Sequence, residues 1–372
     1  MFLSVLLEKW RKNVAINTSK KPLKNFKQIF NRLKWWLLGL LAVLVTFSLF
    51  VPLPFYMESP GGAYDIRQVL SVDDKDDEAD GSYNFVAVSV SRATFAQLVY
   101  AWVTPHTEII SAEAMTGGAS NDDYLRINDY FMQSSQNTAT YQALSLAGKN
   151  VELVYKGVYI LSVNDNSTFK GILNIADTVT GVNGKTFDSS VELIAYVSKL
   201  KLKSDVTVQY TSSGEEKEAK GKVIKLDNGK NGIGISLVDH TGVASDIDVH
   251  FYTEGVGGPS AGLMFTLDIY DQLVDEDLRK GRIIAGTGTI ESDGSVGDIG
   301  GAALKVVAAD EIGADVFFVP NNPVNEEILK EYPDTKTNYE EALEAAKAIG
   351  TDMKIVPVTT AKEAIEYLEK TS

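Results

Sequence analysis

The hydrophobic pattern is densest near the N-terminus. Residues 35 to 51 (WWLLGLLAVLVTFSLFV) carry no charge, and residues 52 to 56 (PLPFY) continue the apolar character. A helix of that length spans about 25 Å, which is most of a hydrocarbon core about 30 Å thick. We therefore predict one transmembrane helix over residues 35 to 55.

Basic residues precede this apolar run. Residues 1 to 34 hold nine Lys and Arg and a single acid, Glu8. Positive charge beside a membrane span marks its cytoplasmic side, so we expect a basic cytoplasmic segment over 1 to 34 and the rest of the chain outside. A cleaved signal peptide and a buried core helix are the alternatives. The long basic region favours an uncleaved anchor.

The pattern then becomes that of a folded protein. Residues 59 to 62 (SPGG) predict a turn after the anchor, and the acidic run 73 to 80 predicts a solvated loop. Residues 83 to 91 alternate as a strand does, and 94 to 102 predict a short helix. From 122 to 148 the pattern is helical again, with Ala139, Ala143 and Ala147 on one face.

A second unit begins near residue 151. A strand at 156 to 163, a strand and turn at 177 to 185, a helix at 189 to 199 and a strand at 205 to 211 resemble a PDZ domain. The resemblance implies that Tyr155, Lys156, Gly157 and Val158 form the loop that receives a chain terminus, and that the following strand pairs with an extended peptide. An ordinary small β domain without a ligand is the alternative.

The last third alternates short strands and helices. A strand at 246 to 253 leads into a glycine-rich turn (EGVGGPSAG), and an apolar helix follows Ser260. A helix is expected at 304 to 312, and strands and helices alternate to the C-terminus. This alternation predicts an α/β or α+β domain.

Composition narrows the function. The chain is 44% hydrophobic and 23% charged, as folded domains are, and it has no cysteine, so neither disulfides nor thiolate metal sites exist. The net charge is -15, and without the basic head the remainder holds 26 basic and 49 acidic residues. Such an acidic body repels phosphate, so we expect no nucleic-acid partner.

Ser260 has the surroundings that a nucleophile needs. Gly257, Gly258 and Pro259 force a tight turn with little bulk around the hydroxyl. The free amides at the start of the following helix could hold a developing oxyanion. A serine after such a turn is also a frequent helix N-cap, and for Ser260 alone that structural role is the stronger interpretation.

A serine nucleophile requires a base. The three histidines stand in a loop (His106), in a turn (His240) and on the strand before the serine (His250), and none has an obvious acidic partner. Lys305 lies in AALKVVAA, where every other residue is apolar. Burial would favour its neutral, basic form; the alternative is a lysine extending to solvent at a helix edge.

Three linked motifs resemble the proteolytic domain of Lon. They are GPSAG at 258 to 262, GTGT at 286 to 289, and GDIGG at 297 to 301 followed by Lys305. The resemblance covers roughly residues 232 to 372, and the serine precedes the lysine by 45 positions. With the anchor and the PDZ-like unit, the chain resembles the PDZ-containing Lon-like (S16-type) surface proteases of Gram-positive bacteria.

The resemblance implies a site. Ser260 would be the nucleophile, Lys305 the general base and then acid, and Thr287 the hydroxyl that orients Lys305. The amides of Gly258 and Ala261, beside that of Ser260, would donate to the oxyanion. One departure is Gly257, because Lon has an acidic residue there. No metal or cofactor is implied.

The resemblance also implies an organisation and a function. Residues 58 to 125 would complete the protease fold, 126 to 225 would be an inserted PDZ domain with a flanking helix, and 230 to 372 the Lon-like domain. No Walker A pattern occurs, so we expect an ATP-independent endopeptidase acting on secreted or surface peptides, such as a peptide pheromone precursor. The alternative is a catalytically inactive peptide-binding scaffold at the cell surface.

Overall fold

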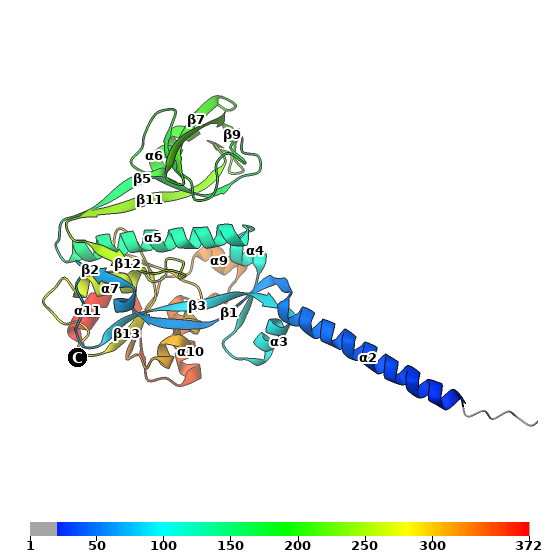
Figure 1. The fold of residues 1–372 in the computed structure, drawn as a ribbon. Helices are drawn as coiled ribbons and strands as arrows, with labels where there is room; N and C mark the ends of the chain where they lie inside the picture. The colour runs from blue at the N-terminus through cyan, green and yellow to red at the C-terminus, as the bar shows by residue number, and fades with distance from the viewer. Residues whose placement is uncertain (1–20, 372) are drawn as a thin grey trace, which may run out of the picture.

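The computed structural model describes residues 21 to 371, with side chains from residue 29 onward. The predicted basic head lies largely outside the described residues. Helix α2 (Lys21–Phe50) projects from the body of the protein (Figure 1). Its stretch Ile29–Phe50 is long and apolar enough to cross a membrane, and none of the residues in its most apolar part is buried against the protein.

Helix α2 ends before the end of the span expected from the sequence. Strand β1 (Pro52–Asp65) starts two residues after Phe50. Proline cannot continue a helix in this position, because it lacks the amide donor and clashes with the preceding turn. Strand β1 also runs through residues 59 to 62, where we expected a turn. A register shift between Pro60 and Ala63 absorbs the glycines inside the strand instead.

One six-stranded sheet organises the body of the protein. Its strands lie in the order β17-β16-β13-β3-β1-β4, and their bounds are β1 Pro52–Asp65, β3 Ser82–Thr94, β4 Glu108–Ser111, β13 Ile283–Gly286, β16 Val316–Pro320 and β17 Lys354–Val358. Strands β3, β13, β16 and β17 are parallel neighbours, whereas β1 is antiparallel to β3 and β4. Segments from both ends of the chain therefore share this sheet.

Helices cover both faces of the sheet. On one face α7 (Gly262–Asp271) packs with α5 (Asn121–Leu146) and α11 (Ala361–Lys370). On the other face lie α8 (Ala302–Glu311) and α10 (Asn338–Ile349). Each face of the sheet has its own hydrophobic core. Consecutive side chains of β3 pack in opposite cores, because side chains alternate along a strand: Phe85 packs on the α7 side and Val86 on the α8 side.

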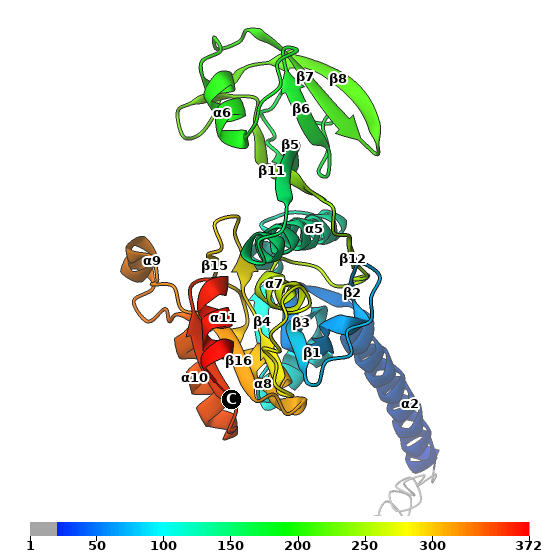
Figure 2. The same cartoon turned by 90° about the vertical axis from the view of Figure 1, so that its left-hand side faces the viewer.

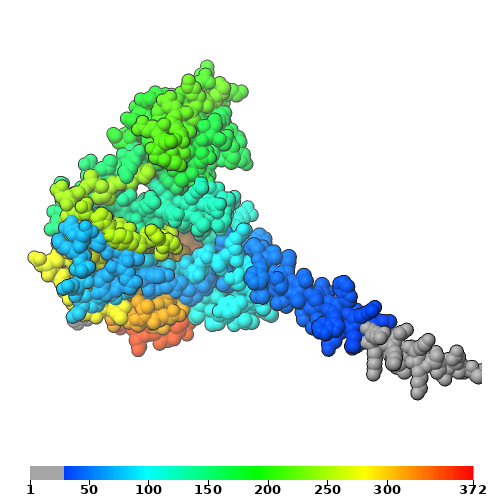
Figure 3. Space-filling view, in the orientation of Figure 1, coloured from blue at the N-terminus to red at the C-terminus, as the bar shows by residue number. Residues whose placement is uncertain are grey.

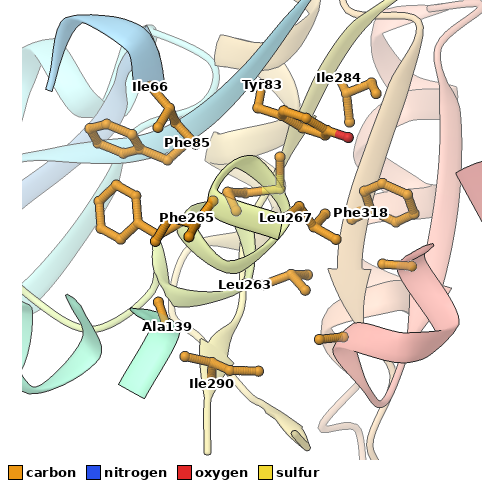
Figure 4. Close-up of a cluster of buried hydrophobic side chains, with 14 of the residues drawn as sticks. Ile66, Tyr83, Phe85, Ala139, Leu263, Phe265, Leu267, Ile284, Ile290 and Phe318 are labelled. Atoms are coloured by element: carbon orange, nitrogen blue, oxygen red, sulfur yellow. The ribbon is translucent and has the colours of Figure 1, made fainter. Parts of the chain in front are cut away.

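The core on the α7 side is centred on an apolar helix. Leu263, Phe265 and Leu267 are fully buried, and Figure 4 shows them surrounded by side chains from the sheet and from α5. Ala139 and Ala143 of α5 are part of this core, as their spacing in the sequence predicted, so α5 packs on the body of the protein. The remaining short helices are η1 Ile66–Gln68, α3 Phe95–Val103, α4 Ala112–Thr116 and α9 Glu326–Glu331.

The PDZ-like unit stands above α5 with a core of its own (Figures 1 and 2). Its sheet has the order β11-β5-β6-β7-β8, covered by α6 (Ser190–Ser198). The strands of this sheet are β5 Val151–Val163, β6 Thr178–Val182, β7 Asp205–Ser212, β8 Glu215–Lys222 and β11 Ile235–Ser245, and the unit also holds the short pair β9 Ile224–Lys225 and β10 Asn231–Gly232. Two other short pairs pack on the α7-side core of the body: β2 Leu70–Val72 with β12 Val249–Phe251, and β14 Thr289–Ile290 with β15 Val296–Gly297. The unit is inserted into the fold of the body, because the strands of the six-stranded sheet precede and follow it along the chain.

Two local expectations were wrong. His240 lies within β11 rather than in a turn, with its ring Nδ1 2.8 Å from Thr178 Oγ1. The acidic run 73 to 80 is not wholly solvated, because Asp77 forms a buried bidentate ion pair with Arg279, with N–O distances of 2.6 and 2.8 Å. The sequence conceals this pair because its partners are 202 residues apart.

Candidate active site

The serine loop connects β12 to α7. Ser260 is half-buried and lies two residues before the helix begins. Two contacts from α5 hold the turn: the Asn128 carbonyl accepts from the Gly258 amide at 2.9 Å, and Ser135 Oγ donates to the Pro259 carbonyl at 2.9 Å. Gly258 has a φ of +89°, which favours glycine. The hydroxyl is therefore presented by a braced turn.

Ser260 is not a helix cap. The N-cap of α7 is Ala261, and no side chain caps that helix end. The serine hydroxyl instead lies 2.9 Å from Lys305 Nζ. The interpretation that was stronger for the isolated sequence motif therefore does not describe this structure.

Lys305 reaches the serine from α8, one turn after the helix begins. Its side chain is buried, with 2% exposed, so it does not extend to solvent. Nζ also lies 3.0 Å from Oγ1 of Thr287, which directly follows β13 and is fully buried. The structure thus brings together the three residues predicted to form the catalytic centre.

Thr287 determines how the amine can point. Its hydroxyl donates to the Ser260 carbonyl at 3.1 Å, so its one proton is committed there and it accepts from Lys305. A neutral amine has two protons and one lone pair. With one N–H directed to Thr287, the lone pair is free to face the Ser260 hydroxyl, which is the orientation a general base needs.

The surroundings of Lys305 adjust its basicity. Burial lowers the pKa of Lys305 to about 8, and the carboxylate of Glu58 partly opposes this shift. Burial raises the pKa of Glu58, and repulsion from Glu108 adds to that rise. Glu58 pairs with Val90 across β1 and β3, on the sheet face that α8 covers. A substantial fraction of Lys305 is therefore neutral near pH 8.

The two amides predicted to donate to the oxyanion differ in whether they are already hydrogen-bonded. Within the described residues, the Ala261 amide donates no hydrogen bond and is available at the start of α7. The Gly258 amide is not available in this conformation, because it donates to the Asn128 carbonyl. The expectation for Gly258 therefore does not fit this state of the loop.

The departure at Gly257 has a structural counterpart. A Cβ atom at Gly257 would lie 2.9 Å from Cβ of Asn128, so α5 leaves no room for an acidic side chain without a shift. The histidines do not contact the centre in the described part of the chain: His250 is exposed, with Nε2 3.9 Å from Oδ1 of Asp74, and none of the three bonds to Ser260 or Lys305.

Sequence reasoning missed three residues of this site. Glu58 lies 247 positions before Lys305, and Asn128 and Ser135 stand in a helix that looked like a flank of the PDZ-like unit. No local pattern marks them. The one available signal was polar residues on an otherwise apolar helix face, which is where Ser135 stands among Met132 and Ala139.

A cleft borders the first half of the serine loop. It has a volume of about 470 Å³ and lies between α5 and the segment 251 to 256. A separate cavity of about 860 Å³ is bordered by Arg282, Asp310 and Lys354, and none of the three catalytic candidates lines either hollow. Among residues 21 to 371 no cluster of three or more His, Cys, Asp or Glu is arranged to hold a metal ion.

The residues predicted to form the peptide-binding loop do not form a loop. Tyr155, Lys156, Gly157 and Val158 are inside β5. Strand β11 pairs along one edge of β5, and β6 pairs with Val158 and Tyr159 on the other. The strand that follows this segment therefore starts with both of its edges occupied by the protein's own strands, which leaves no edge for a peptide at Val158 and Tyr159.

A different cleft of the same unit has the features that bind a chain terminus: an apolar cavity, an edge strand and free backbone amides. It lies between α6 and residues 226 to 237, with an inner cavity of about 60 Å³ lined by Leu193, Ile194, Val197 and Ile233 among others. Strand β11 is at the edge of its sheet. The amides of Ile233 and Gly234 donate no hydrogen bond within the described residues, while their carbonyls are bonded to Ser167 and Asn164.

Family comparisons agree with this division of the chain. The model of the C-terminal proteolytic domain of Lon proteases (S16) matches residues 227–366, and that of the PDZ domain matches residues 145–223. The Lon protease of Metamycoplasma arthritidis (strain 158L3-1) is 32% identical over 111 residues, which are 30% of this chain and 11% of that protein.

Solved PDZ domains are also similar in sequence. The PDZ domain of the SdrC-like protein from Listeria monocytogenes is 33% identical and matches 23% of this chain and 93% of that one, with a TM-score of 0.23. The second domain of a Listeria innocua protein is 39% identical, with coverages of 23% and 87% and a TM-score of 0.22.

The expected fold class is confirmed by the two family matches and the mixed α/β architecture. The Lon match identifies the larger unit as a proteolytic domain, and the apolar helix α2 precedes it. The chain therefore combines a PDZ domain with a Lon-type (S16) proteolytic domain, which is the composition of a PDZ-containing Lon-like protease.

Proposed function

We propose that this protein is a membrane-anchored, ATP-independent serine endopeptidase with a Ser260–Lys305 dyad. The observation that carries the proposal is the buried Lys305 Nζ at 2.9 Å from Ser260 Oγ. That distance lies within the hydrogen-bond reach required of a nucleophile and its base. Thr287 would act as the residue that orients the lysine.

The geometry supports a two-step hydrolysis. Neutral Lys305 takes the hydroxyl proton while Ser260 Oγ attacks the peptide carbonyl, and the Ala261 amide donates to the oxyanion. The resulting ammonium then protonates the leaving amine as the acyl-enzyme forms. In the second step Lys305 deprotonates a water molecule, which attacks the ester and releases Ser260.

The substrates would be short or unfolded chains outside the cell. Helix α2 supports an anchor, and the basic residues before it support a cytoplasmic N-terminus with the protease and PDZ domains outside. The sequence contains no Walker A pattern for an ATP-driven unfolding motor. Secreted or surface peptides, such as a peptide pheromone precursor, fit these conditions and could enter along the cleft beside α5.

The PDZ domain would select these substrates through the cleft beside α6. The free amides of Ile233 and Gly234 could receive a terminal carboxylate, and the apolar cavity an apolar last side chain. The peptide would then pair with the exposed edge of β11. This replaces the peptide-binding loop that we expected at residues 155 to 158.

The direct test compares Ser260→Ala and Lys305→Met with the wild-type chain, using an unfolded peptide library in detergent. Methionine retains the length of the buried lysine while removing its base. We expect each change to reduce cleavage at least ~10³-fold, because either one removes proton transfer to the nucleophile. Ser292→Ala and Lys347→Ala, at exposed positions, are the matched controls.

Circular dichroism and thermal unfolding would show that each variant is folded. Retained cleavage by a folded Ser260→Ala or Lys305→Met protein would refute the dyad. Wild-type protein that binds peptides without cleaving any would favour the inactive scaffold instead.

A further inference from the structure

Helix α3 exposes an apolar surface. None of the residues of Phe95–Val103 is buried, although the segment reads FAQLVYAWV. Trp102 is 88% exposed, Val103 72% and Phe95 57%. Apolar groups that gather on a protein surface in this way mark an interaction site.

The helix is also uncharged. No Asp, Glu, Lys or Arg occurs from residue 93 to residue 105. Gln97, the one strongly polar side chain in the helix, is used locally, because it forms a capping box with Thr94 at the helix start. The surface therefore has no ionised group of its own to keep it in water.

The sheet register fixes where this surface stands. Pro52 of β1 pairs with Thr94 of β3. Pro52 comes two residues after α2 ends at Phe50, and Thr94 comes directly before α3 begins. Helix α3 therefore starts at the level where the membrane-spanning candidate ends, and α2 and α3 are in contact. Figures 1 and 3 show the two segments side by side.

We infer that α3 is a second membrane contact, which lies in the headgroup region of the outer leaflet beside α2. The inference rests on the proposed membrane anchoring. Its partner is the lipid bilayer rather than a second copy of the chain, because an anchor ending at Phe50 holds the start of α3 at the bilayer surface. Tryptophan and tyrosine, here Trp102 and Tyr100, are the residues that prefer that interface.

The consequence is a fixed orientation of the protease. A single spanning helix permits the attached domain to tilt and rotate, whereas a helix lying in the interface adds a second point of contact. Strand β3 leads directly into α3 and is part of the sheet under α7 and α8. Contact of α3 with lipid would hold the serine loop at a set height above the membrane.

Tryptophan fluorescence can test this in the full chain. The chain has four tryptophans, Trp10, Trp35, Trp36 and Trp102, and only Trp102 lies outside the N-terminal and spanning segments. Replacing the other three with phenylalanine leaves Trp102 as the reporter in phosphatidylcholine vesicles. Lipids brominated at carbons 6 and 7 or at carbons 11 and 12 then act as quenchers at two depths.

We expect Trp102 emission to be quenched at least ~2-fold by the shallow bromines, more than by the deep ones, as for an interfacial indole. A tryptophan placed at exposed Tyr332 in a chain lacking the native four is the solvent control. That control should respond to aqueous iodide and to neither lipid.

Two outcomes would overturn the inference. Trp102 that behaves like the Tyr332→Trp control lies in water. Trp102 that is shielded from iodide, insensitive to bromine and dependent on the protein-to-lipid ratio contacts a second copy instead. A chain keeping only Trp36 separates the two proposals: if Trp36 is quenched and Trp102 is not, the anchor stands and the α3 contact fails, whereas quenching of neither refutes both.

Discussion

The catalytic centre and the PDZ cleft are built in opposite ways. The centre gathers three polar side chains from distant segments, and two of them, Thr287 and Lys305, are almost completely buried. The PDZ cleft is shaped by α6 and the chain from residue 226 to 237, and apolar side chains predominate in its inner cavity. In the proposed function the first site moves a proton and the second holds a chain end. Changes in the first should therefore alter kcat, and changes in the second should alter KM.

Among the substitutions that would distinguish the two sites, a change at Thr287 should have the largest effect on catalysis. Thr287→Val keeps the shape and removes the hydroxyl that accepts from Lys305, so the amine loses its orientation. We expect kcat to fall ~10- to 100-fold, the equivalent of one hydrogen bond to a group that becomes charged, ~1.5–3 kcal/mol. Steady-state cleavage of an unfolded peptide measures it. Thr287→Ser should restore most of the rate, and a Val variant as active as the wild type would remove Thr287 from the mechanism.

A smaller effect is expected in the PDZ cleft. Ile194 lines the inner cavity and is 47% exposed, so Ile194→Asp places a carboxylate beside the proposed position of the peptide terminus. KM should rise ~10-fold for a peptide with a free apolar C-terminus while kcat is unchanged, because the two carboxylates repel and the peptide's last side chain, worth ~1.5 kcal/mol or more when buried, loses its contact with Ile194.

Ile172→Asp is the matched control, because Ile172 is 42% exposed in the same domain and does not line the cleft. The C-terminally amidated peptide should show little difference between the variants. An equal rise in KM for Ile172→Asp, or a change confined to kcat, would contradict a binding role for this cleft.

The smallest effect concerns Glu58. Its carboxylate opposes the lowering of the pKa of Lys305, so Glu58→Gln should lower that pKa further. The rising limb of the pH–rate profile would then move to lower pH, and the variant would be a few-fold more active than the wild type below the wild-type limb. A limb that stays in place or moves to higher pH would show that Glu58 does not act on Lys305.

The three residues predicted for the catalytic centre lie together in the structure, whereas those predicted for the peptide site lie inside a paired strand, and the difference has a physical reason. Ser260, Thr287 and Lys305 each lie within four residues of a glycine with a positive φ, namely Gly258, Gly288 and Gly301, so their motifs are visible locally. The residues that brace them are not, because Asn128 and Ser135 act through tertiary contacts with Gly258 and Pro259. The alanine spacing of α5 indicated a buried face without indicating which domain it would face.

The prediction of the peptide-binding loop at residues 155 to 158 failed because it did not take into account how β5 pairs in its sheet. A Tyr-Lys-Gly-Val segment before a strand is a plausible terminus-binding loop, but whether the strand has a free edge is decided by its neighbours in the sheet. Residue 157 illustrates this: a Cβ there would lie 2.3 Å from the Val179 carbonyl, so its glycine serves the contact between β5 and β6. The pattern Gly-Ile-Gly-Ile at 232 to 235, which contributes the free amides of the proposed cleft, carries no local sign of that role in the sequence.

The most direct test of the central claim is the pH dependence of kcat/KM for the wild-type protein between pH 5 and 10. Lys305 acts as a base only when neutral, and its pKa is lowered to about 8 by burial. Activity should therefore rise tenfold per pH unit below that value and level off above it. A profile that is flat across this range, or that falls as the pH rises toward 8, would contradict a lysine base.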